Sequence, residues 1–277
     1  MSAGPRGARD AGDETLQQRL EKLTEPVTFK RAMGLIGSTT LGVGALMGAG
    51  LYVLVGIAAG EAGPALPIAY AICGGLTFLS VLMYADLARR LPISGGGYAY
   101  AYEKLGSFWG FMVGWHLAVG SVFACALYAH GFASYLVSFF PAHFAEEWLY
   151  RLIAVALVAG LTGLGLHAGE GGDRLQRILT WGNVAVLAVL AVVSSPLISG
   201  ARFVPVFPRG AGGVGAAISL IYISFFGYQL IANSAEEIRS PERTVPRAMY
   251  LAMGLAVLFY VAIGAVAVGA GPGDPDL

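Results

Sequence analysis

The residues best placed to do chemistry in this chain are the glycines of an apolar stretch, residues 39–56, which reads TTLGVGALMGAGLYVLVG. Five of its 18 residues are glycine. Each glycine in a helix interior costs up to about 1 kcal/mol relative to alanine, so the stretch is a poor helix. A break there frees backbone N–H and C=O groups, which hydrocarbon tolerates only beside a buried or wet cavity. We therefore predict a helix break that serves a binding site.

A second apolar segment, residues 212–236, carries a similar interruption. It begins apolar, reaches Gly227 midway and then turns polar. The amide end of a half-helix suits a carboxylate, and the carbonyl end suits an ammonium group or a cation. Two such breaks in corresponding places point to a central site for a zwitterion. The alternative for the first break is close helix packing through Gly44 and Gly48, and for Gly44 and Gly56 both roles stay open.

The elements that must position these breaks are membrane helices. Of the 277 residues, 56% are hydrophobic and 12% are charged, which is about half the charged share of a soluble domain. This composition predicts an all-α polytopic membrane protein. Because about 20 apolar residues span a bilayer, seven segments qualify: 35–58, 66–91, 107–140, 150–168, 175–198, 212–236 and 246–270.

The positive charges are unevenly shared between the two sides of these segments. When the segments alternate in direction, 14 of the 17 Lys and Arg fall on the side of the N-terminus. The positive-inside rule then predicts an integral, multi-pass protein of the plasma (inner) membrane with a cytoplasmic N-terminus. We expect residues 1–30 to form a disordered cytoplasmic tail without a cleavable signal peptide, and residues 31–277 to form the transmembrane domain.

Several function classes find no support in the sequence. The net charge is zero, so the sequence shows no excess of basic residues of the kind that binds nucleic acid. Cys73 and Cys125 lie inside apolar runs and suggest neither a disulfide nor a metal site. No nucleophile and base are paired in a way that predicts an enzyme, and we expect no cofactor.

Charged residues cluster at the ends of two predicted helices. Since they lie at the edge of the membrane, we favour a structural or gating network for them over contact with a substrate. The members of this predicted network are Asp86, Arg89, Glu236, Glu237 and Arg243.

Three long strings carry a family resemblance that covers residues 25–271. They are LGVGALMGAGLYVLVGIAAGEAGPALPIAYAICG, YADLARRLPISGGGYAYAYEKLGSFWGFMVGWHL and FFGYQLIANSAEEIRSPERTVPRAM. They resemble helix signatures of amino acid permeases of the amino acid–polyamine–organocation superfamily, in the branch of the cationic amino acid transporters. The resemblance implies a LeuT-like fold of two inverted five-helix repeats, the first over 35–198 and a partial second over 212–270.

The resemblance also implies residue roles, in which the unwound parts of helices one and six hold the substrate's backbone. The stretch that would face the carboxylate is Met47, Gly48, Ala49 and Gly50. The stretch that would face the α-amino group is Ile223, Ser224, Phe225, Phe226 and Gly227.

Three features depart from the family pattern. Gly120 stands where the third helix of cationic amino acid transporters has an acidic residue, which speaks against arginine or lysine as substrate. Asn183 stands where some relatives have a lysine in place of a sodium ion, so a coupling proton loses its obvious carrier and is left open. The chain ends soon after the seventh segment, so we expect a C-terminally truncated form without the later helices.

The resemblance therefore implies a secondary active transporter that moves amino acids or related amines by alternating access. Its partners would be an amino acid substrate and the lipid bilayer. The alternative is a truncated or non-transporting membrane protein that needs a partner or further helices.

Overall fold

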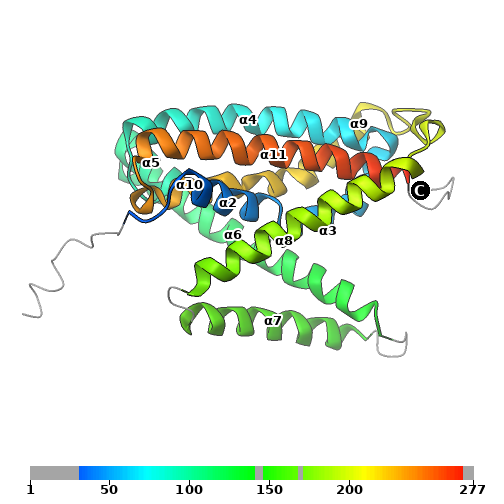
Figure 1. Cartoon of the computed structure of the whole chain (residues 1–277), viewed down its shortest axis with the longest axis horizontal. Coiled ribbons are helices and arrows are strands. Elements are labelled where there is room, and N and C mark those ends of the chain that lie inside the picture. The colour runs from blue at the N-terminus through cyan, green and yellow to red at the C-terminus, as the bar shows by residue number, and fades with distance from the viewer. Residues whose placement is uncertain (1–30, 141–145, 168–170, 271–277) are drawn as a thin grey trace, which may run out of the picture. The chain divides into compact units, whose positions relative to one another are not determined.

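The structure, a computed structural model, describes residues 31–140, 146–167 and 171–270 (Figure 1). The predicted tail, residues 1–30, lies outside these ranges. Within them every named element is helical, and one isolated parallel bridge pairs Met33 with Ile238. The elements are α2 (Leu35–Leu46), α3 (Ala49–Ala62), η1 (Gly63–Ala65), α4 (Leu66–Arg90), α5 (Gly96–Leu105), α6 (Ser107–Val137), α7 (Glu147–His167), α8 (Gly171–Ser194), η3 (Ser195–Leu197), η4 (Gly200–Phe203), α9 (Gly210–Ile221), η5 (Tyr222–Tyr228), α10 (Gln229–Asn233), η6 (Ala235–Glu237) and α11 (Pro241–Gly269).

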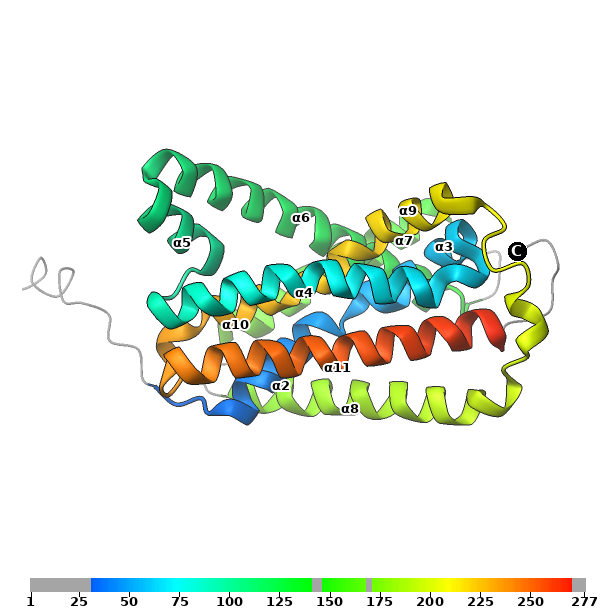
Figure 2. The ribbon, with the colours of Figure 1, turned by 90° about the horizontal axis from the view of Figure 1, so that it is seen from above.

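Six runs in the described residues are long and apolar enough to cross a membrane, against seven segments predicted. The first run, Leu35–Arg90, has 56 residues and would measure about 84 Å as one straight helix, far more than a bilayer is thick. The chain turns back at η1, where Gly63 has a φ of +56°. Figure 2 shows α4 running back from this turn. The first run therefore contains two of the seven predicted segments.

The core forms where α11 lies between α4, α2 and α8 (Figure 2). α11 presents small and flexible side chains to these neighbours, and Ala248, Ala252 and Ala256 are fully buried. Small side chains allow membrane helices to approach closely, which favours packing where burial of apolar surface gives no driving force. The core also includes residues of both helices in which breaks are predicted, among them Leu46, Met47 and Phe225.

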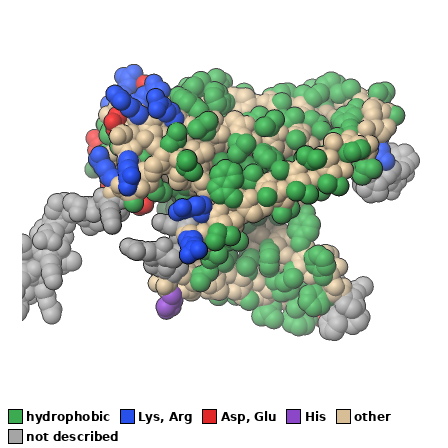
Figure 3. Space-filling view, viewed as in Figure 1, with side chains coloured by type: hydrophobic (Ala, Val, Ile, Leu, Met, Phe, Trp, Pro, Cys, Tyr) green, Lys and Arg blue, Asp and Glu red, His purple; other side chains and the backbone are tan. Residues whose placement is uncertain are grey.

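α6 and α7 contrast with this core. In the most apolar window of α6 only 6% of residues are buried, and in that of α7 none is, against 44% for the run Leu35–Arg90. Their large apolar side chains stay uncovered within the part of the chain that the structure describes, and Figure 3 shows such side chains spread over the visible surface. Uncovered apolar surface of this kind is what hydrocarbon accepts without penalty.

Residue types that disfavour helix lie inside helices at two places. Gly95 (φ +104°) precedes α5 in a left-handed conformation, and Gly96 (φ +49°) is the first residue of that helix. Pro246, predicted as a segment boundary, lies inside α11. That helix begins at Pro241, because a proline in the first turn gives up an N–H that has no helical acceptor.

Candidate functional site

The first helix breaks at the predicted place. α2 ends at Leu46 and α3 begins at Ala49, with Met47 (φ −84°, ψ 38°) and Gly48 (φ −88°, ψ −158°) between them. The N–H of Met47 still donates to the carbonyl of Val43, at 2.8 Å. Gly48 is extended, so the chain leaves the helix for two residues and then re-enters it. The prediction of a break near residues 47–50 is confirmed.

Neutral side chains from other helices satisfy the carbonyls at this break. The last carbonyls of a helix have no intrahelical donor, and leaving one buried without a partner costs about 1–3 kcal/mol. The Asn183 side-chain amide on α8 donates to the Met47 carbonyl, and the Tyr260 hydroxyl on α11 donates to the Leu46 carbonyl. Asn183 is itself held by Tyr52 of α3, whose hydroxyl donates to its side-chain oxygen.

The second break is confirmed in place but differs in form. Between α9 and α10 the chain tightens into a seven-residue 3₁₀-helix, η5, instead of opening. Such runs rarely exceed three or four residues, and inside a longer helix they often mark a functional hinge. The predicted cause, Gly227, has a packing role here. A Cβ on Gly227 would lie 2.5 Å from the Leu46 nitrogen and 2.7 Å from the Ala45 oxygen, so η5 and α2 touch backbone to backbone.

The two broken helices run antiparallel to each other. α2 packs on η5 and α10, whereas α3 packs on α9. This order places the N-terminus of α3 beside η5. The amides that begin α3 and the carbonyls of η5 therefore lie close together, as recognition of a zwitterion requires.

Gly50 and Ser224 meet at this junction. A Cβ on Gly50 would lie 2.7 Å from the Ser224 Oγ and 3.3 Å from the hydroxyl of Tyr128 on α6. Ser224 is 2% exposed, and its Oγ has no hydrogen-bond partner in the described part of the chain. A buried hydroxyl without a partner is costly. The hydroxyl lies beside the first amides of α3, where a bound ligand would supply its hydrogen-bond partner.

The other residues of the predicted second stretch divide between core and surface. Phe225 is fully buried, and its ring centroid lies 4.7 Å from that of Tyr260. Phe226 is 37% exposed and Ile223 is half-buried. Among residues 223–227, only Ser224 therefore combines a buried side chain with a polar group directed at the first break.

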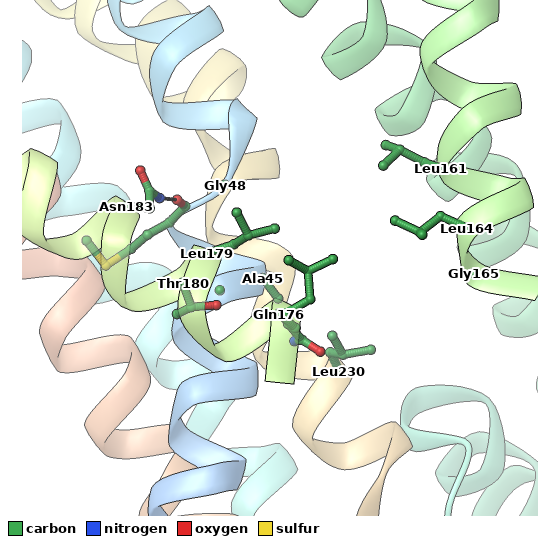
Figure 4. Close-up of a pocket in the computed structure, with 13 residues that line it drawn as sticks. Ala45, Gly48, Leu161, Leu164, Gly165, Gln176, Leu179, Thr180, Asn183 and Leu230 are labelled. Carbon is green, nitrogen blue, oxygen red and sulfur yellow. Dashed lines mark hydrogen bonds between the residues drawn. The ribbon is translucent and has the colours of Figure 1, made fainter. Parts of the chain in front are cut away.

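A cavity of about 540 Å³ reaches the first break from the side of α7 and α8 (Figure 4). Gly48 and Asn183 lie on one wall, and Leu161 and Leu164 of α7 lie on the wall opposite, and Met47 also lines the cavity. The cavity is otherwise mainly apolar, and residues 223–227 do not line it. It gives access to the α2–α3 junction without reaching η5.

The predicted charged network lies at the end of the molecule where α4 ends and α11 begins. The backbone N–H of Ser94 donates to Glu236 Oε1 (3.2 Å), and the N–H of Glu236 donates to Ser94 Oγ (3.1 Å). The N–H of Met33 donates to the carbonyl of Glu237 (3.1 Å). These bonds tie the chain before α2 and the loop before α5 to η6.

The remaining members of the network lie on the two long helices. Asp86 pairs with Arg90 at 3.0 Å, with both side chains largely exposed. Arg89 belongs to the last turn of α4, and the N–H of Arg243 donates to the Ser240 carbonyl in the first turn of α11. A gating role for the five residues stays a prediction.

Sequence reasoning did not single out Tyr260, Tyr52 or Tyr128. A signal was present in each case, because a phenol in a long apolar segment needs a hydrogen-bond partner where water is scarce. What the sequence did not contain was the identity of that partner, which is the Leu46 carbonyl for Tyr260 and the Asn183 side chain for Tyr52.

Comparison with known proteins identifies the family. The family model for amino acid permeases matches residues 28–274. The chain belongs to this family. The branched-chain amino acid permease BcaP of Bacillus subtilis is 26% identical over 275 residues, which cover 94% of this chain and 59% of the relative. An uncharacterized transporter of Mycobacterium tuberculosis is 33% identical (91% and 56%), and human cationic amino acid transporter 4 is 30% identical (89% and 42%).

The match confirms the superfamily resemblance and the all-α polytopic membrane fold. The chain spans little more than half the length of the bacterial relatives. These relatives are permeases and transporters, so the comparison does not favour a non-transporting membrane protein.

Proposed function

We propose that the protein is a secondary active transporter that moves amino acids, or related amines, across the membrane by alternating access. The observation that carries this proposal is the meeting of two broken helices around the buried Ser224 hydroxyl, which has no hydrogen-bond partner among the described residues. Membership of the amino acid permease family supports it. Relatives named for branched-chain and for cationic amino acids agree on a substrate with an amino acid backbone.

In the proposed site the substrate's carboxylate lies at the N-terminus of α3. The amides of Gly48, Ala49 and Gly50 and the helix dipole would stabilise its negative charge. Met47 precedes them and, with its carbonyl held by Asn183, fixes where the chain turns. The Ser224 hydroxyl would donate to the same carboxylate and so gain the partner that it lacks.

The α-ammonium group would lie on the opposite side, against η5. Carbonyl oxygens of residues 223–227 are the acceptors we assign to it, because a 3₁₀-helix directs its carbonyls outward with poorer internal hydrogen bonds. Phe226 and Ile223 would flank the group, whereas Phe225 and Gly227 hold η5 against the core and α2. Recognition by backbone groups at both ends needs no buried side-chain charge.

Transport would arise from movement between two parts of the molecule. We propose that α2, α3, α4, η5, α10 and α11, which share the core, move as one bundle against α6 and α7. The first repeat would run over 35–198 and the second would begin at 212. The inverted order of the two broken helices supports such a repeat.

We also propose a plasma membrane location with the N-terminus in the cytoplasm. Lys and Arg gather at the end of the molecule where α5 and α10 lie (Figure 3). Arg89 and Arg90 lie in the last turn of α4 there, and Lys104 lies in the last turn of α5. Positive charge on one end is the pattern of a cytoplasmic face.

Uptake into proteoliposomes tests the proposal. The full-length protein is reconstituted and offered labelled amino acids of neutral, cationic and acidic side chain, with protein-free liposomes as control. We expect time-dependent uptake, or exchange against internal substrate, for at least one class. An imposed pH gradient shows whether a proton accompanies the substrate. Absence of uptake and exchange for every amino acid and amine would refute the proposal.

A further inference from the structure

Tyr260 of α11 touches both broken helices with one atom. Its hydroxyl donates to the Leu46 carbonyl at the end of α2 and lies 3.0 Å from the Ser224 carbonyl in η5. The side chain is fully buried, and its ring packs on Phe225 of η5 and on Tyr70 of α4. α11 itself is continuous through this region.

The contact matters because it joins the two breaks at their backbone. A tyrosine hydroxyl has one proton to donate, so the two carbonyl oxygens share it. Two carbonyl oxygens that face each other repel unless a donor lies between them. The hydroxyl therefore holds the end of α2 and the middle of η5 at a set separation.

This separation sets the geometry of the proposed site. Leu46 precedes the turn that leads into the α3 amides, and Ser224 carries the unpartnered hydroxyl that lies against Gly50. A shift of either backbone would move the groups that we assign to the carboxylate away from those that we assign to the ammonium. Binding that depends on groups from both breaks is sensitive to such a shift.

We propose that Tyr260 is a positioning residue of the substrate site: its hydroxyl ties the two broken helices together and does not itself touch the substrate. The inference rests on the proposed function and adds to it the residue that keeps the two breaks in register. Asn183 holds only the first break, since its bonds reach Met47 and Tyr52. Tyr260 alone among these donors reaches both.

The chain supplies a matched control in Tyr70. This tyrosine is also fully buried, and its ring centroid lies 5.4 Å from that of Tyr260. Its hydroxyl has no hydrogen-bond partner in the described residues. Tyr260→Phe and Tyr70→Phe therefore each remove one buried hydroxyl from the same cluster, but only the first removes a tie between the breaks.

The test measures uptake kinetics and amide hydrogen exchange of wild type and both variants. We expect Tyr260→Phe to raise KM for the transported amino acid at least ten-fold with a smaller change in the maximal rate, and Tyr70→Phe to leave KM within two-fold. Without substrate, Tyr260→Phe should speed exchange in both segments 44–51 and 222–228, and Tyr70→Phe in neither.

Each outcome has a distinct meaning. An unchanged KM in Tyr260→Phe, or equal changes in the two variants, would overturn the inference even if thermal stability fell, because a merely structural hydroxyl predicts that result. If the wild type transports nothing, the proposed function fails instead. The exchange measurement then still tests whether Tyr260 links the two breaks. Faster exchange in only one of the two segments would count against that link.

Discussion

The two helix breaks meet at one place but are built in opposite ways. The α2–α3 break opens the chain at Met47 and Gly48, and side chains from α8 and α11 satisfy its carbonyls. The α9–α10 break stays helical, tightens into η5 and is held by direct backbone contact at Gly227. An open break depends on hydrogen-bond donors brought by other helices, whereas a tightened break depends on the absence of a side chain.

This difference assigns different roles to the glycines. Apart from the neighbouring residues in the chain, the atom nearest to a Cβ on Gly48 would be the Gly44 oxygen at 3.6 Å, so the open break has room. A Cβ on Gly227 would meet backbone atoms that cannot rotate away. The fold should therefore tolerate an added methyl group at Gly48 but not at Gly227.

The largest effect is expected for Gly227→Ala. The new methyl group would lie 2.5 Å from the Leu46 nitrogen and 2.7 Å from the Ala45 oxygen, so η5 must move off α2. We expect loss of most folded protein in detergent, measured by size-exclusion chromatography and thermal unfolding, and loss of uptake. Gly48→Ala is the comparison and should keep the wild-type elution profile. Equal stability of the two variants would contradict the distinction.

Gly50→Leu should abolish uptake while the protein still inserts and folds. A Cβ at this position lies 2.7 Å from Ser224 Oγ, and the remaining leucine atoms would fill the space between the first amides of α3 and η5. Ser224 and Tyr128 are side chains that can rotate, so the fold should survive. Membrane-fraction yield and thermal stability are measured beside uptake. Normal transport by this variant would remove the junction from the substrate site.

Asn183→Leu should lower uptake by roughly ten-fold, because the Met47 carbonyl loses its donor at a cost of about 1–3 kcal/mol. The control on the same helix is Trp181→Phe, which removes an N–H that donates to Thr40 Oγ1 at 3.2 Å, away from the break. Uptake by that variant should stay within about two-fold of wild type. A larger loss for Trp181→Phe than for Asn183→Leu would show that the open break does not depend on its donors.

The smallest effect is expected away from both breaks, for Asp86→Asn. Both side chains of the Asp86–Arg90 pair are largely exposed to solvent, and such ion pairs contribute little to stability. We expect the melting temperature to change by less than about 2 °C. A strong loss of uptake at unchanged stability would instead assign this pair to a gate.

The place of the first break followed from the sequence because glycine carries a large local penalty in an apolar run, and Met47 and Gly48 lie at the centre of that run. The helical segments also followed from the sequence, because a run of about 20 apolar residues is itself a local signal. The form of the second break did not, since η5 depends on how closely Gly227 approaches α2, a contact between residues far apart in the chain. Phe225 and Phe226 are adjacent and chemically alike, yet one lies in the core and the other is partly exposed.

Other features escaped prediction because weak local signals favoured a different structure. Glycine favours turns, yet of the three glycines at 95–97 only Gly95 lies before α5, and Gly96 and Gly97 are its first two residues. Pro246 indicated a helix boundary, although packing of the continuous α11 against α4 and α2 overrides the lost hydrogen bond. Tyr260 acts through backbone carbonyls, which leave no trace in side-chain patterns.

The central claim is that the substrate binds where the two breaks meet, and cysteine labelling tests it most directly. Ser224→Cys is made in a protein whose Cys73 and Cys125 are replaced by alanine, with Ser219→Cys on the exposed face of α9 as control. A small membrane-permeant thiol reagent is applied with and without a saturating transported amino acid. We predict that the substrate slows labelling of residue 224 at least ten-fold and leaves residue 219 unchanged. Equal labelling of residue 224 with and without substrate would contradict the account.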